Sequence, residues 1–348
     1  MNTKPRLAVS IGDPNGIGPE VTFKMLLALD LSLSTPIVSA PHLLFQRLIE
    51  EQNNFNLGAI RTIPTINYIS DHSQVVEGAI NVLESLESWS NLEFSSCNYG
   101  QITALAGEIS MQSVFTGIQL CLNKHAHALV TAPISKESIQ LAGYKVPGHT
   151  EYLMEQTGAE DVVMMLSGRG LNICLLTTHL PLKSVVYHIN KTIFISKIRI
   201  ICNHFNTYKS DRKLKIAVLG INPHAGDGGV LGYEEQEIIE PVFESFHNDP
   251  TVELTGPFPA DAFFGRKQFL KYDVVLATYH DQGLIPFKLW SMGRGVNCTL
   301  GLPFIRTSPD HGTAFDIVGK WKAEPDSMLE AYKVALAYLS TSQKTDMI

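Results

Sequence analysis

Residues 6–29 read RLAVSIGDPNGIGPEVTFKMLLAL, and this stretch contains the pattern that recurs along the chain. Residues 6–12 form an apolar run with the length of a β-strand. Residues 19–29 are predicted to form a helix, and their proline stands in the first turn, where its missing N–H costs no hydrogen bond. The segment therefore predicts a strand and a helix joined by a tight loop of glycine, proline and asparagine.

The same succession continues through the 348 residues. Further strands are expected at 36–40, 128–132, 161–166, 172–177, 214–219, 273–278 and 296–300. Further helices are expected at 43–51, 108–124, 134–141, 151–157, 192–205, 233–246 and 327–339. Strands that alternate with helices predict an α/β fold with a mixed or mostly parallel sheet. Residues 52–104 are the hardest to interpret, with short strands expected near 66–69 and 92–96 and a helix around 74–88.

Composition excludes several classes of protein. The formal net charge is −7 and no run of Lys or Arg occurs, so no nucleic-acid partner is expected. No uncharged apolar stretch approaches the roughly 18 residues of a membrane span, and the first residues lack the apolar core of a signal peptide. The 5 cysteines form no C-x-x-C pair, which argues against a disulfide framework. We therefore expect a soluble, cytoplasmic protein without a membrane partner.

Three histidines stand at the ends of apolar runs: His179 after residues 173–176, His224 after 216–219 and His280 after 274–277. Ligands of open α/β sheets bind outside the carboxyl ends of the strands. Three imidazoles brought there can hold one divalent cation and leave a position for substrate. The alternative is that each is a separately hydrogen-bonded loop histidine, and position alone leaves both interpretations open.

Two glycine-rich loops, residues 12–18 and 220–232, each open a predicted helix and are candidates for holding an anion. The first has neither the G-x-G-x-x-G nor the Walker pattern, and a tight structural corner explains it equally well. In the second, close backbone approach of a ligand, with Gly226 and Gly228 as the candidates for contact with a cofactor, and a turn built of glycine are both open. Farther along the chain, Lys288, Asn297 and Arg306 follow the last strand-end histidine and can bind a phosphate or carboxylate.

Eight motifs in one order identify a family resemblance. They are GDPNGIGPE (12–20), TAPISK (131–136), PGHTE (147–151), TTHLPL (177–182), NPHAG (222–226), GPFPAD (256–261), YHDQG (279–283) and RTSPDHGT (306–313). Together they resemble the 4-hydroxythreonine-4-phosphate dehydrogenase family of pyridoxal phosphate biosynthesis, from about residue 6 to 338 and most weakly across 52–104. The chain departs from the family pattern at Asn15, Ala262 and Pro309, none of which is a metal or substrate position.

The resemblance implies an isocitrate/isopropylmalate-dehydrogenase-like fold, with mixed sheets flanked by helices. It implies one dehydrogenase unit over residues 1–348, made of two interleaved α/β subdomains with the active site in the cleft between them. Residues 1–35, 130–160 and 214–340 would form parts of that cleft. The implied assembly is a homodimer with the metal site shared across the interface, His179 from one subunit and His224 and His280 from the other.

The resemblance also assigns roles to single residues. His179, His224 and His280 would hold one divalent metal ion, such as zinc, magnesium or cobalt. His149, Thr150, Lys288, Asn297 and Arg306 would bind a small phosphorylated hydroxy amino acid. Residues 311–320 (HGTAFDIVGK) are similar to the adenosine-binding stretch of β-decarboxylating dehydrogenases, which assigns His311, Gly312, Thr313 and Asp316 to NAD or NADP. NAD is expected to be preferred, because a carboxylate at Asp316 would repel a 2′-phosphate.

The implied reaction oxidises 4-(phosphooxy)-L-threonine to 2-amino-3-oxo-4-(phosphooxy)butanoate, which loses carbon dioxide to give 3-amino-2-oxopropyl phosphate. Lys288, Asp261 and Asp281 are the candidate bases, and the sequence does not choose among them. One alternative keeps the family but changes the substrate to threonate or erythronate 4-phosphate. An alternative from a different class is a zinc hydrolase or lyase, in which a three-histidine site activates water.

Overall fold

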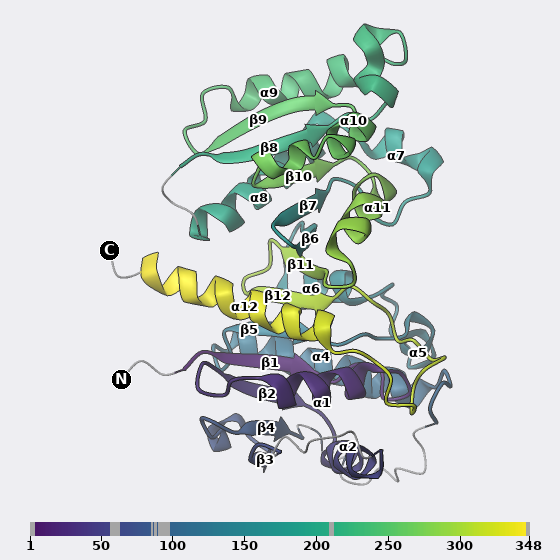
Figure 1. Cartoon of the computed structure of the whole chain (residues 1–348), viewed down its shortest axis with the longest axis vertical. Helices are drawn as coiled ribbons and strands as arrows, with labels where there is room; N and C mark the ends of the chain where they lie inside the picture. The colour runs from purple at the N-terminus through teal and green to yellow at the C-terminus, as the bar shows by residue number, and fades with distance from the viewer. Residues whose placement is uncertain are drawn as a thin grey trace. The chain divides into compact units, whose positions relative to one another are not determined.

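The computed structural model describes residues 4–55, 63–84, 86, 89, 98–208 and 212–345, with the backbone alone for 208 and 341–345. The chain divides into two compact units, which we describe separately. Unit 1 comprises Met1–Ala159 and Leu302–Ser340, and unit 2 comprises Glu160–Gly301 and Thr341–Ile348. The chain therefore passes from unit 1 to unit 2 at Glu160 and returns to unit 1 at Leu302 (Figure 1).

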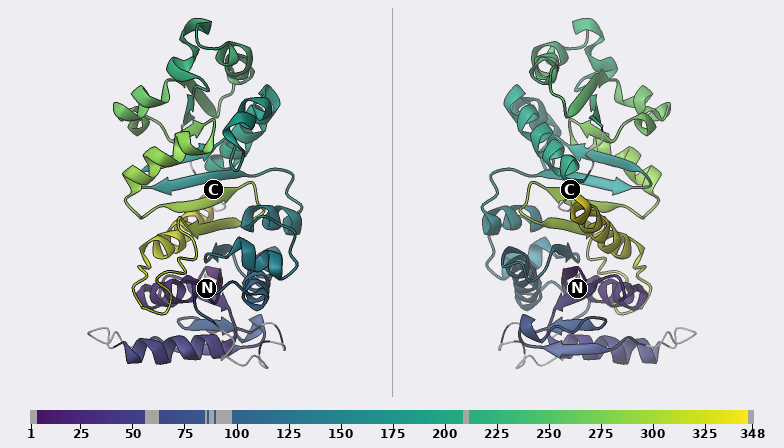
Figure 2. Two further views of the ribbon diagram at one scale, coloured as in Figure 1. Left: turned by 90° about the vertical axis from the view of Figure 1, so that its right-hand side faces the viewer. Right: turned by 90° about the vertical axis from the view of Figure 1, so that its left-hand side faces the viewer.

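The strands of unit 1 are all parallel and follow the order β3-β4-β2-β1-β5-β12. Their bounds are β1 Arg6–Ser10, β2 Thr35–Ser39, β3 Ile66–Ile69, β4 Ile80–Leu83, β5 Ala128–Thr131 and β12 Ile305–Pro309. The helices are α1 Gly18–Ala28, α2 His42–Asn54, α4 Ala104–Leu122, α5 Lys136–Leu141, α6 His149–Thr157 and α12 Asp326–Thr345, with the 3₁₀ turn η1 at His72–Gln74. Figures 1 and 2 show α1 and α12 on one face of this sheet and α4 on the other.

The strands of unit 2 follow the order β11-β6-β7-β10-β8-β9, in which β6 is antiparallel to its neighbours and the last four are parallel. Their bounds are β6 Val163–Gly168, β7 Leu171–Leu175, β8 Leu214–Leu219, β9 Val252–Phe258, β10 Val274–Ala277 and β11 Val296–Leu300. The helices are α7 Leu182–His188, α8 Lys191–Tyr208, α9 Glu240–Phe246, α10 Ala260–Gly265 and α11 His280–Ser291, with short turns η3 Pro223–Gly229, η4 Glu235–Ile239 and η5 Gln268–Lys271. Helices α8 and α11 cover opposite faces (Figure 2).

Burial of the strands explains why they read as continuous apolar runs. Every residue of β2, β5 and β10 is buried, as expected for strands covered by helices on both faces. Helix α4 packs on β1, β2 and β5 and contributes Met111, Val114 and Ile118 to the core of unit 1. The predicted α/β class and the mixed, mostly parallel strand arrangement are confirmed.

The expectations differ from the structure mainly in two segments. The helix expected around 74–88 is wrong, because Ile80–Leu83 forms strand β4 and pairs with both β2 and β3. The strand expected near 92–96 lies outside the described residues. Five further helices and strands of the described chain, α7, β9, α10, α11 and β12, were not expected. In the described part of the chain no helix has both the length and the apolar character required to cross a membrane.

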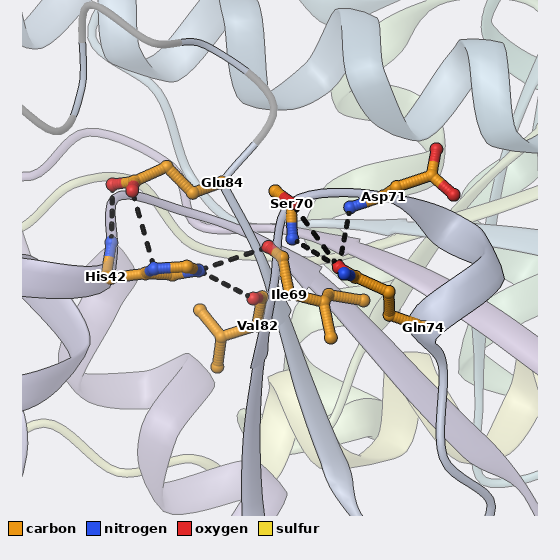
Figure 3. A network of polar contacts seen from close by, with 7 residues as sticks. All are labelled: His42, Ile69, Ser70, Asp71, Gln74, Val82 and Glu84. Atoms are coloured by element: carbon orange, nitrogen blue, oxygen red, sulfur yellow. Dashed lines mark hydrogen bonds and ion pairs between the residues drawn. The ribbon is translucent and has the colours of Figure 1, made fainter.

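A polar network holds the edge of the unit 1 sheet, where β3 and β4 end (Figure 3). The Nε2 atom of His42 faces the carbonyl oxygens of Val82 and Ile69 at 3.0 and 3.2 Å, and Glu84 accepts the His42 backbone N–H at 2.9 Å. On the other side, the Oε1 atom of Gln74 accepts the backbone N–H groups of Ser70 and Asp71 at 2.9 and 3.2 Å. These bonds fix the turn that follows β3.

Candidate functional site

The topology of unit 2 brings the three strand-end histidines to one edge of the sheet. Strand β10 lies between β7 and β8 and is parallel to both. Because parallel strands end at the same edge, the loops that carry His179, His280 and His224 leave from neighbouring positions. The apolar runs therefore predicted the placement of these loops correctly.

His179 and His280 lie side by side. Their ring centroids are 6.0 Å apart, and both line a cavity of about 290 Å³ together with Thr178, Leu180, Leu182, Val185, Tyr279 and Asp281. With metal–nitrogen distances of about 2.1 Å, two imidazoles on one tetrahedral cation have centroids roughly 5 Å apart. The observed separation of 6.0 Å is longer than this, so the two rings must approach each other slightly to share one cation.

Asp281 orients the ring of His280. Its Oδ1 atom accepts a hydrogen bond from Nδ1 of His280 at 2.8 Å. This bond places the proton on Nδ1 and leaves Nε2 available as a ligand, the arrangement common for metal-binding histidines. Of the three candidate bases, Asp281 is the one that lines this cavity, whereas Lys288 on α11 and Asp261 on α10 are exposed outside its lining.

His224 is not part of this cavity lining. It is exposed and lies in an unusual turn in which five consecutive residues, 224–228, have left-handed backbone angles; φ is 54° at His224, 52° at Ala225 and 46° at Asp227. Among the described residues of one chain, no three His, Cys, Asp or Glu side chains come together as a cation site. The structure therefore brings two of the three histidines together within a chain and leaves the third apart.

The second glycine-rich loop is held by the buried side chain of Glu235. Its Oε1 atom accepts the backbone N–H groups of Ile221 and Asn222, both at 2.7 Å. Gly226 packs against this carboxylate, since a Cβ atom there would lie 2.7 Å from Glu235 Oε2. A Cβ atom at Gly228 would meet nothing within 4 Å. The glycine at 226 thus serves packing, whereas the backbone at 228 is open to a ligand.

In unit 1 the predicted substrate residues His149 and Arg306 interact. Arg306 is 3% exposed on β12, and its guanidinium donates to Thr131 Oγ1 at the end of β5, at 2.7 Å. His149 begins α6, followed by Thr150, and its Nε2 atom is shielded from solvent without a hydrogen-bond partner. Burial and the neighbouring Arg306 hold the pKa of His149 well below its ordinary value. The pair therefore consists of a cation and a neutral imidazole.

Lys288 and Asn297 belong to unit 2. Asn297 lies on β11 opposite Leu166, and its Oδ1 atom is buried without a hydrogen-bond partner. Lys288 is exposed on α11, two turns after Asp281 and on the same helical face. The five predicted substrate residues are thus divided between the two units.

The first glycine-rich loop is a structural corner. A Cβ atom at Gly12 would lie 2.5 Å from the Pro133 carbonyl oxygen, and one at Gly16 would lie 2.9 Å from Thr313. The backbone N–H of Ile17 donates to the carbonyl of Thr313 at 2.9 Å. Buried Asp13, whose pKa burial raises, places a carboxyl group inside this loop, which disfavours an anion there.

The same contacts fix the predicted cofactor loop against that corner. Thr313 is packed on Gly16, Gly312 and Asp316 are exposed, and Lys320 Nζ donates to the backbone carbonyl of Asp316 at 2.6 Å. The Nδ1 atom of His311 lies 3.1 Å from the Gly312 carbonyl. The Asp316 carboxylate is therefore at the surface, accessible to a nucleotide.

Sequence reasoning missed several residues that shape these sites. Thr131, Glu235, Thr278 and Gln282 act through bonds to distant parts of the chain. Gln282 and Thr131 do lie within the family motifs YHDQG and TAPISK, and their place in these motifs is the one sequence feature that could have indicated a role at the site.

The chain is an α/β protein of two units, with polar side chains gathered at the ends of parallel strands, where such folds bind small ligands. It belongs to the family described as pyridoxal phosphate biosynthetic protein PdxA, whose family model matches residues 33–335.

Relatives extend this match over nearly the whole chain. A 4-hydroxythreonine-4-phosphate dehydrogenase of Sulfurihydrogenibium sp. (strain YO3AOP1) is 39% identical over 331 residues, 95% of this chain and 97% of the relative. The crystal structure of a 4-hydroxythreonine-4-phosphate dehydrogenase from Klebsiella pneumoniae has a TM-score of 0.83 and 34% identity, covering 97% of this chain and 99% of the other. A terephthalate 1,2-cis-dihydrodiol dehydrogenase from Burkholderia xenovorans LB400 has a TM-score of 0.65 and 25% identity, covering 96% and 98%.

Proposed function

We propose that this protein oxidises 4-(phosphooxy)-L-threonine with a nicotinamide cofactor and a divalent metal ion. The product, 2-amino-3-oxo-4-(phosphooxy)butanoate, then loses carbon dioxide to give 3-amino-2-oxopropyl phosphate, in pyridoxal phosphate biosynthesis. The observation that carries this proposal is the near full-length similarity to dehydrogenases named for this substrate. Because the reaction draws on cytoplasmic coenzyme and phosphorylated metabolites, the proposal places the protein in the cytoplasm.

Arg306, His149 and Thr150 bind the phosphate in this proposal. The Arg306 guanidinium is buried and aligned by Thr131, so it is ready to form charge-assisted bonds to an anion. His149 stays neutral near neutral pH because of burial and Arg306, and can donate one N–H to a phosphate oxygen. Lys288 and Asn297 contribute a second positive charge and a buried amide to the remaining polar groups of the substrate.

His179, His224 and His280 hold the cation in this proposal. The closeness of His179 and His280, and the Asp281 bond to Nδ1 of His280, support it. When bound, such a cation supplies Lewis acidity that lowers the pKa of a substrate hydroxyl. Zinc, magnesium and cobalt are all candidates. Asp281, Asp261 and Lys288 remain the candidate bases, and Asp281 lies nearest to the histidine pair.

NAD is the preferred cofactor in this proposal, held by residues 311–316 and by the second glycine-rich loop, where the backbone at Gly228 is open and Gly226 packs against Glu235. The exposed Asp316 carboxylate can accept a hydrogen bond from the ribose 2′-OH and repels a 2′-phosphate. Replacement of Asp316 by Asn is expected to reduce the preference for NAD over NADP, measured as the ratio of kcat/KM for the two. An unchanged ratio would contradict this assignment.

The proposed assembly is a homodimer whose metal site is completed across the interface. Exposed apolar side chains occur on α7, which borders the histidine cavity, and on α11, which begins at His280: Leu182, Val186 and Tyr187 on α7, Ile285 and Leu289 on α11, and Met292 directly after α11. Exposed apolar side chains of this kind are available for a protein interface. The partition implied by the family takes His179 from one subunit and His224 and His280 from the other. Because the His179 and His280 rings lie close together within one chain, a second candidate partition takes both from one subunit and His224 from its partner.

The test incubates the protein with 4-(phosphooxy)-L-threonine, NAD and a divalent metal while recording absorbance of reduced cofactor. We expect reduction that requires the metal. Faster turnover of threonate or erythronate 4-phosphate would move the protein to that alternative substrate. Product formation without reduced cofactor would favour the zinc hydrolase or lyase.

A further inference from the structure

A continuous set of hydrogen bonds joins the three histidine loops at the points where they leave strands β7, β10 and β8. The hydroxyl of Thr177, which precedes His179 on its loop, donates to the backbone carbonyl of Thr278 at 2.8 Å. Thr278 in turn precedes His280 and is fully buried. The two loops that follow β7 and β10 are therefore tied together behind the histidine pair.

Gln282 links this pair to the third loop. It lies in the first turn of α11, and its Oε1 atom accepts the Thr278 backbone N–H at 2.7 Å and its hydroxyl at 3.0 Å. Its Nε2 atom donates to the backbone carbonyl of Gly220 at 2.7 Å, where the His224 loop leaves β8. One amide side chain thus bridges the ends of two strands, at Thr278 and Gly220, that are 58 residues apart in sequence.

The loop beyond Gly220 needs such an anchor. Non-glycine residues in left-handed conformations are strained, and they persist only where surrounding contacts hold them. The turn that carries His224 contains three of them in five residues. Glu235 holds the backbone N–H groups at Ile221 and Asn222 on one side, and Gln282 holds the Gly220 carbonyl on the other.

We propose that Gln282 is a positioning residue for the metal sites: by bridging Thr278 and Gly220 it orders the loops that carry His280 and His224, so that in a dimer with shared sites one Gln282 orders ligand loops for both. The inference rests on the proposed function, because it takes the three histidines as ligands. Gln282 touches neither the cation nor the substrate in this scheme. Its contribution is to reduce the conformational freedom of the ligand loops before the cation binds.

The experiment titrates Co²⁺ alone into the metal-stripped full-length protein and follows its visible absorption. The variants are Gln282→Ala, and Gln282→Met, which keeps the length of the side chain and loses its hydrogen bonds. Both are expected to weaken Co²⁺ binding about 10–100-fold, as is usual for residues that orient metal ligands. The matched control is Gln74→Ala, which removes a glutamine that also accepts two backbone N–H groups, in unit 1 (Figure 3), and should leave the Kd unchanged.

Thermal unfolding of the metal-free proteins separates positioning from simple stabilisation. Variants that unfold at lower temperature yet bind Co²⁺ like the wild type would overturn the positioning role and leave the proposed function intact. A wild-type protein that takes up no Co²⁺ would overturn the proposed metal site and this inference with it. Weaker binding by both Gln282 variants, measured well below their unfolding temperatures, would support it.

Discussion

Mixing of inactive histidine variants tests how the metal site is assembled. His179→Ala, His224→Ala and His280→Ala are each expected to abolish metal-dependent turnover, because loss of one of three ligands removes most of the affinity. If His179 and His280 of one subunit act with His224 of its partner, His179→Ala and His224→Ala complement each other. In a mixed dimer one site then contains both alanine substitutions, and the other site contains three intact histidines.

The expected recovery follows from the geometry of a two-fold dimer. When equal amounts exchange at random, about half of the dimers are mixed and each has one intact site, so about a quarter of all sites recover. The second mixture, His179→Ala with His280→Ala, separates the two partitions. It restores nothing if the pair with centroids 6.0 Å apart acts together in one subunit, and about a quarter if those two residues come from different subunits.

The assay measures metal-dependent reduction of NAD before and after exchange, with subunits that carry different tags so that mixed dimers can be counted. His224→Ala mixed with His280→Ala provides the reciprocal test and should recover where the second mixture does not. Failure of every mixture to recover, despite demonstrated mixed dimers, would refute a shared site and place all three histidines in one chain.

Three further predictions follow from single residues. Arg306→Ala is expected to raise KM for the phosphorylated substrate about 10–100-fold, because it removes one charge-assisted hydrogen bond of about 1.5–3 kcal/mol. Metal affinity should change little, and steady-state kinetics measure the change in KM. Gly226→Ala should lower the unfolding temperature more than Gly228→Ala, since both pay about 1–2 kcal/mol for a left-handed residue but only the first meets Glu235. Burial lowers the pKa of His204 to about 4. Between pH 6.5 and 4 the unfolded chain therefore binds a proton that the folded chain does not, and the free energy of unfolding decreases as the pH is lowered. Urea unfolding of His204→Leu should show about 1–2 kcal/mol less loss between pH 7.5 and 5 than the wild type; an equal loss would contradict the burial argument.

The strand-end histidines were predictable because each follows an apolar run that is buried on both faces of its strand. Such runs are local in sequence, and their common direction in a parallel sheet fixes where the following loops emerge. Helix α11 was not predictable in the same way. Pro286 stands in its interior, where it removes a backbone donor, and the sequence therefore reads as a break. Strand β12 was hidden because Arg306 and Pro309 interrupt its apolar pattern.

The supporting contacts could not be predicted from residue spacing, although Gln282 stands inside the YHDQG motif. Glu235 accepts N–H groups 13 and 14 residues earlier, and Gln282 reaches a carbonyl 62 residues away. Whether a Glu or Gln side chain meets such a partner depends on how the strands are ordered. Spacing along the chain therefore predicts ligand candidates but not the residues that hold them in place.

The return of the chain to unit 1 has a consequence for synthesis on the ribosome. Strand β5 pairs with β12 on one side, but β5 ends at Thr131 and β12 begins at Ile305, and most of the residues between them belong to unit 2. At about 5–20 residues per second, synthesis of these roughly 170 residues makes β5 wait roughly 9–35 s for its neighbour. During that interval one edge of β5 has no partner strand, although every residue of β5 is buried in the folded protein. Such an exposed apolar edge can pair with other polypeptides. Unit 2, whose sheet comes from one continuous segment, can complete its strand pairing first.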